Sequence, residues 1–293
     1  MGSLIAGHGG NGSGRALRER LAAGEILVVP GAFDALTGRL LERAGFEAIY
    51  RGGYAASAAA FGLPDLGITS STEMVDHARR LCSAVSIPVI ADADTGYGEV
   101  AQVIRTVHEL ERAGVAAIQL EDQVFPKRCG HMDGKDVIAP ELHEQKLRAA
   151  LAARAHPDTL IVARTDAIAV TGFDDALARA RRYAAAGADV IFIDAPRSED
   201  ELRAIGAAGI GKPLLVNVSE YGRTPDLGAA RFAALGFAIA LYPTSTLFAA
   251  AQSTKELAAA LRESGSTRSV VPRMMPFDEL NETLGKDDWD VNP

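Results

Sequence analysis

Eight short runs of β-branched and other apolar residues recur along the chain. They are residues 26–32, 48–53, 88–96, 117–122, 160–166, 190–196, 213–220 and 237–245. Each run has the length of a buried strand. Because strands that alternate with helices are typical of parallel sheets, the spacing predicts eight βα units.

Segments with helical periodicity fill the intervals between these runs. Examples are residues 33–44, 71–85, 99–113 and 173–186. Several of these segments end at an Ala-Gly pair, where glycine supplies the left-handed residue that terminates a helix. The glycines are Gly45, Gly114 and Gly187. Ser70 or Ser71, before Glu73, and Ser198, before an acidic run, are predicted to mark helix starts.

Eight strand–helix units in one chain of this length predict an α/β protein with a closed (β/α)8 barrel of the TIM type. The alternative is a doubly wound open sheet, which typically carries a Gly-x-Gly-x-x-Gly turn after its first strand. Here the first run is followed by the sequence PGAFD at residues 30–34, which lacks that spacing. We therefore favour the barrel.

No linker divides the chain, so we expect one catalytic barrel domain over residues 15–265. The glycine-rich residues 1–14 are expected to be a disordered leader. Residues 266–293 depart from the βα pattern. We expect them to form a C-terminal extension that packs on the barrel or on a neighbouring subunit.

Composition and charge narrow the classes of function. The chain has 293 residues and carries 30 Lys and Arg against 38 Asp and Glu, a net charge of −8. Nucleic-acid binders are usually basic, so no nucleic-acid partner is expected. No apolar run reaches the roughly 20 residues that span a bilayer, so no membrane association is expected. Two cysteines give no disulfide framework, which favours a cytoplasmic location.

Acidic side chains gather where two of the predicted strands end. Residues two apart on a strand share a face, so Asp92 and Asp94 point the same way, and Glu121 ends the next run. Barrel enzymes place their active sites at these carboxyl ends. Convergent carboxylates favour Mg²⁺, with Mn²⁺ as a second candidate. The alternative is a set of salt bridges to nearby cations, namely Lys127, Arg128 or Arg164.

A long polar loop follows the fourth run and contains Lys127-Arg128-Cys129-Gly130-His131. A cysteine flanked by cations is more acidic than an isolated thiol. A zinc site is excluded because one Cys and one His, with no second pair, supply half of the ligands. The loop is therefore a candidate part of the active site, with Cys129 as a reactive thiol and not as a zinc ligand.

This loop resembles the signature loop of the isocitrate lyase and phosphoenolpyruvate mutase superfamily. Other segments are similar in the same order along the chain. They are residues 62–67 (GLPDLG), 92–98 (DADTGYG), 121–123 (EDQ), 163–167 (ARTDA) and 217–225 (NVSEYGRTP). The resemblance spans residues 15–285. It is closest to the 2-methylisocitrate lyases and to the 2,3-dimethylmalate and petal-death-type lyases.

The resemblance implies a Mg²⁺-dependent lyase that breaks a carbon–carbon bond in a 2-hydroxy di- or tricarboxylate. The products would be a 2-oxoacid such as pyruvate and a second carboxylate. The implied metal-site residues are Asp92, Asp94 and Glu121, which bind partly through water, and Asp65 nearby.

The resemblance also implies a catalytic set. Cys129 would protonate the carbanion that bond cleavage leaves, and Arg164 would grip a carboxylate. His131 and Asn217 would bind the far carboxylate. The other implied substrate-binding residues are Tyr50, Gly52, Gly53, Lys127, Arg128, Gly130, Asp194 and Pro243.

Three positions leave the substrate open. Gly52 stands where the family commonly has Ser or Thr. Asp194 stands where methylisocitrate lyases usually have Glu, and Tyr54 is more similar to the petal-death-type lyases. All three lie in the implied substrate pocket, so the chemistry is expected to hold while its substrate is not fixed.

Other interpretations and an assembly remain as expectations. The alternatives are an oxaloacetate hydrolase or decarboxylase, an enzyme similar to carboxyphosphonoenolpyruvate mutase, and a barrel without catalytic activity. Members of the superfamily are usually homotetramers that exchange a C-terminal helix between subunits. The Ala- and Leu-rich residues 246–264 are the candidate for that helix.

Overall fold

One parallel sheet of eight strands organises the molecule, in a computed structural model that describes residues 13–130, 132 and 134–289. The strands are β1 (Leu27–Pro30), β2 (Ile49–Arg51), β3 (Val89–Asp92), β4 (Ala117–Glu121), β5 (Leu160–Thr165), β6 (Val190–Ile193), β7 (Leu214–Asn217) and β8 (Ile239–Tyr242). Their order is β1-β8-β7-β6-β5-β4-β3-β2. A parallel bridge between Gly31 and Tyr50 joins the two edges. The predicted barrel is confirmed, and the open sheet is wrong.

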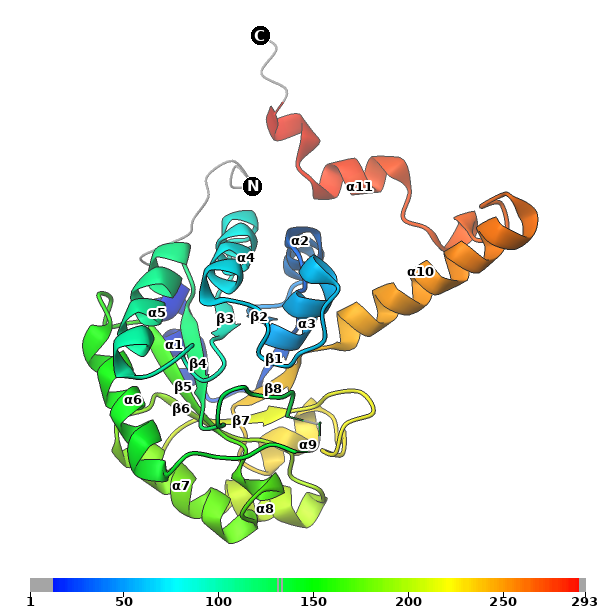
Figure 1. Cartoon of the computed structure of the whole chain (residues 1–293). Helices are drawn as coiled ribbons and strands as arrows, with labels where there is room; N and C mark the ends of the chain where they lie inside the picture. Colours follow the sequence, from blue (N-terminus) through cyan, green and yellow to red (C-terminus); the bar gives the residue numbers. More distant parts are fainter. Residues whose placement is uncertain (1–12, 131, 133, 290–293) are drawn as a thin grey trace.

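Helices surround the barrel and connect its strands (Figure 1). They are α1 (Ser13–Ala22), α2 (Ala35–Arg43), α3 (Gly53–Ala56), α4 (Ser71–Ala84), α5 (Val100–Ala113), α6 (Pro140–Ala153), α7 (Phe173–Ala185), α8 (Glu199–Gly206), α9 (Ala229–Ala234), α10 (Ser245–Ser264) and α11 (Phe277–Thr283). A π-helical turn, η1 (Ser57–Phe61), extends α3, and short 3-10 turns are η2 (Ala167–Ala169), η3 (Val271–Arg273) and η4 (Lys286–Trp289).

Local sequence signals explain where the helices begin and end. Ser70 accepts a hydrogen bond from the Glu73 amide, and the Glu73 side chain accepts one in return, which makes a capping box on α4. Ser198 caps α8 by accepting from the Glu201 amide. The predicted terminating glycines have positive φ values, 90° at Gly45, 95° at Gly114 and 110° at Gly187. These predictions are confirmed.

The strands are shorter at their carboxyl ends than the apolar runs. The run 88–96 gives a strand that ends at Asp92. Beyond it the backbone turns, with positive φ at Asp94 (50°) and Gly96 (86°), so these residues cannot continue the ladder. The turn carries the polar end of the run over the mouth of the barrel.

The hydrophobic core has two layers. Side chains such as Val29, Ile90, Val162 and Phe192 fill the barrel interior, and Leu17 of α1 packs against this inner cluster. A second, larger cluster lies between the strands and the outer helices. The interior is therefore a packed core, and the chemistry is confined to one end.

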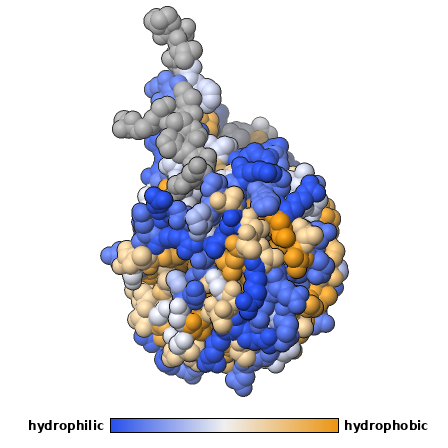
Figure 2. Space-filling model, turned by 90° about the vertical axis from the view of Figure 1, so that its left-hand side faces the viewer, coloured by the Kyte–Doolittle hydropathy of each residue, from blue (hydrophilic) through white to orange (hydrophobic). Residues whose placement is uncertain are grey.

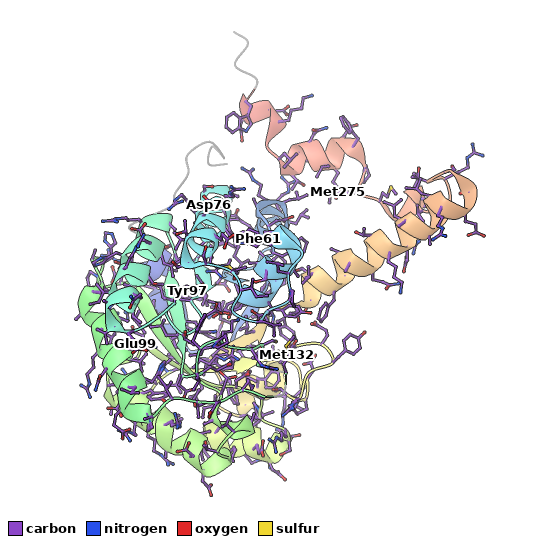
Figure 3. All side chains as sticks on the ribbon, viewed as in Figure 1. Phe61, Asp76, Tyr97, Glu99, Met132 and Met275 are labelled. Atoms are coloured by element: carbon purple, nitrogen blue, oxygen red, sulfur yellow. The ribbon has the colours of Figure 1, made fainter. Side chains whose placement is uncertain are left out.

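The two ends of the described chain behave differently. Helix α1 begins at Ser13, inside the range expected as leader, and Gly14 lies against the Asp158 backbone. The rest of that range, residues 1–12, lies outside the described residues. At the other end, α10 projects away from the barrel and buries none of its residues (Figure 1). Figure 3 shows Met275 on the segment that follows, well apart from the barrel.

The surface is a mosaic of hydrophilic and hydrophobic residues on the face drawn in Figure 2. This is the pattern expected of outer helices with one apolar and one polar side. Within the described part of the chain, we find no helix that combines the length and the apolar character needed to cross a membrane.

Candidate active site

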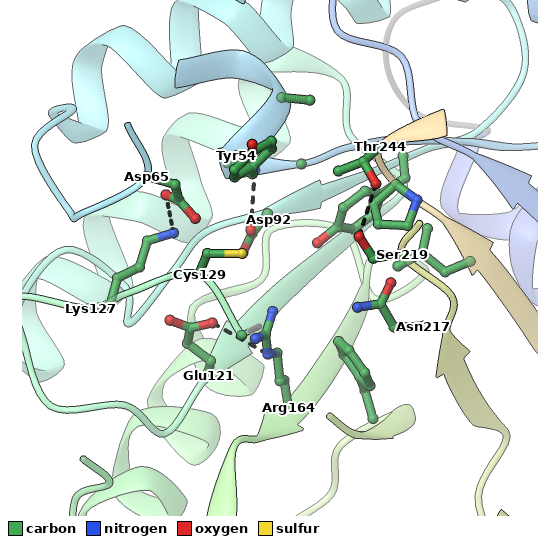
Figure 4. Close-up of a pocket in the computed structure, with 18 of the residues that line it drawn as sticks. Tyr54, Asp65, Asp92, Glu121, Lys127, Cys129, Arg164, Asn217, Ser219 and Thr244 are labelled. Carbon is green, nitrogen blue, oxygen red and sulfur yellow. Dashed lines mark hydrogen bonds and ion pairs between the residues drawn. The ribbon is translucent and has the colours of Figure 1, made fainter. Parts of the chain in front are cut away.

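A cavity opens where the strands end (Figure 4). Most of the predicted site residues line it. They are Tyr50, Gly52, Gly53, Asp65, Asp92, Glu121, Lys127, Arg128, Cys129, Gly130, Arg164, Asn217 and Pro243. Asp94 and Asp194 are buried next to this lining and pair with Lys127 and Arg164, respectively. The predicted His131 lies outside the described residues.

Lys127 joins two carboxylates on one side of the cavity. Its Nζ lies 2.5 Å from Asp65 Oδ1 and 2.7 Å from Asp94 Oδ1, and all three side chains are buried. Burial raises the pKa of Asp94 to about 6. The charge of Lys127 opposes that rise, whereas the charges of Asp92 and Asp65 add to it. The cluster therefore holds more negative charge than Lys127 compensates.

Asp92 is held by a set of donors at the end of β3. Its carboxylate accepts hydrogen bonds from the Gly53 amide (3.2 Å), the Asp94 amide (3.1 Å) and Gln119 Nε2 (3.2 Å). Burial opposes its ionisation, but Lys127, Arg164 and Arg51 together keep the pKa of Asp92 below its usual value. Asp92 therefore presents a charged carboxylate in a fixed orientation.

Arg164 lies at the centre of a second cluster. Its guanidinium makes a two-pronged bond to Asp166, from Nε at 2.8 Å and from Nη2 at 2.9 Å. Nη2 also donates to Asp194 Oδ2 at 3.0 Å, and Asp194 Oδ1 accepts from Asn217 Nδ2 at 3.3 Å. The guanidinium therefore faces the cavity in an orientation set by its neighbours, as recognition of a carboxylate requires.

The surroundings of Glu121 show whether the site fits the expected metal ion. The Glu121 side chain is buried, and its Oε1 has no hydrogen-bond partner among the described residues. Burial raises the pKa of Glu121 well above its usual value, although Arg164 Nε, 3.4 Å from Oε2, opposes the rise. An unsatisfied carboxylate oxygen beside other acids is what a bound cation would satisfy.

Direct ligation by many side chains is not what the site offers. The described residues contain no group of three His, Cys, Asp or Glu side chains arranged to hold one ion. Mg²⁺, however, keeps several waters in its shell and uses only one or two carboxylates. The acids around Glu121 therefore fit Mg²⁺ held largely through water. The salt bridges considered as the alternative are also present, on Lys127 and Arg164.

The loop after β4 brings Cys129 to the cavity. Gln123 clamps its start, because its amide donates to the Arg128 carbonyl (2.9 Å) and accepts from the Arg128 amide (3.0 Å). Gly130 lies so close to Asp194 and Arg164 that any side chain there would overlap them. Cys129 is half-buried and points toward the middle of the cavity (Figure 4).

Several residues of the site were not predicted. They are Phe192, Leu241 and Thr244, which line the cavity. Apolar residues at the end of a strand give no signal that separates a pocket wall from the core. Gly52, which replaces a family hydroxyl, lies against the Tyr50 ring, where a Cβ atom would be 3.0 Å from Cε1. A larger residue would therefore need Tyr50 to move.

Comparison with known proteins identifies the family. Residues 17–262 match the family model described as phosphoenolpyruvate phosphomutase. The 2,3-dimethylmalate lyase of Eubacterium barkeri is 45% identical over 269 residues, which cover 92% of this chain and 93% of that protein. The 2-methylisocitrate lyase of Aeropyrum pernix is 41% identical over 277 residues, with 94% and 89% coverage.

Solved structures agree with this result. Oxaloacetate acetylhydrolase in complex with 3,3-difluorooxalacetate superposes with a TM-score of 0.90 at 35% identity, covering 94% of each chain. Phosphonopyruvate hydrolase in complex with oxalate and Mg²⁺ gives a TM-score of 0.85 at 34% identity, covering 94% of this chain and 95% of that one. The expected resemblance is confirmed: the chain belongs to the phosphoenolpyruvate phosphomutase family, within the superfamily that also contains the isocitrate lyases.

Proposed function

We propose that the protein is a Mg²⁺-dependent carbon–carbon lyase that acts on an alkyl-substituted 2-hydroxy dicarboxylate. One observation carries this proposal: a single cavity holds the Cys129 thiol, the Arg164 guanidinium and the acids around Glu121. The lyase relatives support the enzyme class. The products would be a 2-oxoacid and a second carboxylate.

Glu121, Asp92 and Asp94 would hold the metal, and Asp65 lies nearby. When bound, Mg²⁺ supplies positive charge that makes the 2-hydroxyl of the substrate more acidic. The related phosphonopyruvate hydrolase, which was solved with oxalate and Mg²⁺, supports this assignment.

The residues of the chain then divide the reaction between them. Arg164 grips a substrate carboxylate and orients the bond between C2 and C3. In this proposal the 2-hydroxyl passes its proton to the Glu121 carboxylate, whose Oε1 has no hydrogen-bond partner among the described residues. C2 then becomes a carbonyl carbon, and the electron pair of the broken bond passes to C3. The Cys129 thiol donates its proton to C3 and leaves a thiolate, as a general acid does. This role requires the thiol to point into the cavity, as it does (Figure 4).

The shape of the cavity favours an alkyl-substituted dicarboxylate. Its wall at the ends of β6, β7 and β8 is formed by apolar side chains and hydroxyl groups (Figure 4). They are Phe192, Leu241, Pro243, Ser219 and Thr244, next to the Asn217 amide at the end of β7. Among the described residues of this wall there is no Lys or Arg to pair with a third carboxylate. A 2-alkylmalate therefore fits the wall better than methylisocitrate.

A substrate panel tests the proposal. The protein is incubated with Mg²⁺ and 2-alkylmalates, methylisocitrate, isocitrate or oxaloacetate, and release of a 2-oxoacid is measured. We expect 2-alkylmalates to give the highest kcat/KM, and EDTA to abolish turnover. We also expect Cys129→Ser to lose about 10²–10⁴-fold in kcat with little change in KM, because an alcohol is a far weaker acid than a thiol. Near-native turnover by this variant would contradict the lyase mechanism.

Hydrolysis of oxaloacetate is the second candidate. The close superposition on oxaloacetate acetylhydrolase favours it. A hydrolase needs a positioned water molecule in place of a proton donor to carbon. Cleavage of oxaloacetate that survives in Cys129→Ser, with no activity on 2-alkylmalates, would establish this alternative. A protein that binds no Mg²⁺ in a calorimetric titration would instead be a barrel without this catalytic activity.

The setting of the enzyme is part of the proposal. We propose a homotetramer in which α10 and the residues after it pack on another subunit, since none of the α10 residues is buried in its own chain. A cytoplasmic location is supported by the cysteine content, because Cys82 and Cys129 are too few for a disulfide framework.

A further inference from the structure

A buried lysine connects the Cys129 loop to the Arg164 cluster. Lys135 lies in the same loop, and its side chain is only 2% exposed. Its Nζ lies 3.0 Å from Asp166 Oδ1 and also donates a hydrogen bond to the Gly130 carbonyl. A buried ammonium group is costly unless it is paired, and here both of its partners belong to the site.

The carboxylate that Lys135 binds is the one that holds Arg164. Asp166 is fully buried and makes the two-pronged bond to the Arg164 guanidinium. Burial opposes the ionisation of Asp166, but the charges of Arg164 and Lys135 lower its pKa below the usual range. Asp166 is therefore a charged link between the two cations.

The same interactions fix the backbone next to Cys129. Gly130 is pressed against Asp194 and Arg164, with no room for a Cβ atom. Its carbonyl is held by Lys135 from the other side. Gly130, the residue that follows Cys129, is thus held between the Arg164 cluster and a lysine anchored to that cluster.

We propose that Lys135 is a positioning residue that sets the place of the Cys129 thiol relative to Arg164. Lys135 acts through Gly130 and Asp166 and does not itself reach the cavity. The proposal rests on the proposed function only where it concerns turnover, because the position of the thiol can be measured without any substrate.

A purely structural role would give a different outcome. Lys135 could simply neutralise Asp166, and any side chain that fills the space would then leave the thiol where it is. Positioning predicts instead that a side chain of similar length without the charge releases the peptide next to Cys129. The hydrogen bonds that are lost involve charged, buried groups, which are the strong class.

The test uses the rate at which iodoacetamide alkylates Cys129, followed by mass spectrometry of the intact chain and its peptides. Lys135→Met removes the ammonium group at similar length, and Lys135→Arg keeps a charge. Lys212→Met, in the half-buried segment before β7 at the other end of the barrel, is the matched control. Cys82, which is 3% exposed, reports whether the barrel stays folded, since it should remain unlabelled.

We expect alkylation of Cys129 to rise about tenfold or more in Lys135→Met, because hydrogen bonds to charged groups of this kind shift local equilibria by that order. Lys135→Arg and Lys212→Met should stay within about twofold of the wild type. On the substrate found by the panel, Lys135→Met should lose kcat by about 10²-fold, within the range of general acid catalysis, while KM changes little.

The two possible failures are distinguishable. Unchanged alkylation in folded Lys135→Met overturns the positioning role, whatever the reaction is. If the panel finds no substrate but alkylation rises as expected, the proposed function fails and the positioning role of Lys135 stands.

Discussion

Asp94 combines a left-handed backbone, complete burial and a pKa raised from 3.8 to about 6. Because the folded-state pKa lies above the unfolded value, ionisation of Asp94 lowers stability as the pH rises from about 4 to about 6. A bound cation would reverse that cost. Asp94 must lose its proton before it can accept Mg²⁺, so binding should depend on pH in the same interval.

We therefore expect Mg²⁺ to raise the Tm more at pH 7.5 than at pH 5. At a concentration of one hundred times Kd, Mg²⁺ would stabilise the fold by about 2.7 kcal/mol. At one pH unit below the pKa of Asp94, the affinity for Mg²⁺ should be lower by roughly a factor of ten, which is about 1.4 kcal/mol of binding free energy. Thermal unfolding at both pH values measures this difference. Asp94→Ala should abolish the Mg²⁺ shift while the protein still folds, and an unchanged shift would remove Asp94 from the site.

Gly130 is required by the space around it, since its backbone lies against Asp194 and Arg164. Both neighbours are buried and fixed by ion pairs, so neither can retreat cheaply. We expect Gly130→Ala to displace the loop and lower kcat by about 10²-fold, a loss of general acid catalysis, while the Tm changes little. Steady-state kinetics and thermal unfolding of the same sample measure the two effects. A normal kcat would show that the loop works in a different position.

Individual helices depend on signals that are local in the sequence. The capping box of α4 rests on Ser70 and Glu73, three residues apart. The start of this helix could be predicted because both residues lie in one turn. We expect Ser70→Ala to lower the free energy of unfolding by about 0.5–2 kcal/mol. Urea denaturation gives the value. Ser83→Ala, at an exposed position of the same helix, is the control and should be near neutral. Equal losses in both variants would exclude a special role for the cap.

The elements themselves could be predicted because strand and helix periods, glycine terminators and N-caps are read over a few residues. The carboxyl ends of the strands were predicted less accurately. The run 88–96 looks apolar and extended, but positive φ at Asp94 ends the ladder at Asp92. Such a turn depends on what the neighbouring strands place around it, and no local pattern encodes that.

At the scale of the molecule, the motifs located the site but did not predict the ion pairs within it. The acids, Arg164 and Cys129 were found from strand ends and from a family resemblance, and the cavity brings them together. The pairing of Lys135 with Asp166 joins positions 31 residues apart and exists only because β5 and the loop after β4 meet. Asp194, expected as a substrate-binding residue, pairs with Arg164, because its carboxylate reaches the guanidinium at 3.0 Å.

The C-terminal segment carries the prediction that concerns the whole molecule. Helix α10 has 20 residues and none is buried, and apolar side chains beyond it are exposed. They include Val271 (51%), Phe277 (79%) and Trp289 (64%). Apolar surface gathered on one segment is typical of an interface. Within the described residues, one ion pair, between Arg43 and Glu282, joins this segment to the barrel.

We therefore expect the full chain to be a tetramer in solution. A chain that ends after Gly265 should form a smaller assembly, because the apolar side chains after that residue would be missing from the interface. Analytical ultracentrifugation of both proteins measures the assembly, and circular dichroism should show that the truncated barrel keeps its fold. Glu282→Ala, which removes the exposed ion pair alone, is the control and should leave the tetramer intact, since such pairs contribute about 0–1 kcal/mol. A full chain that sediments as a monomer would contradict the expected assembly. The exposed apolar side chains after Gly265 would then require a different binding partner.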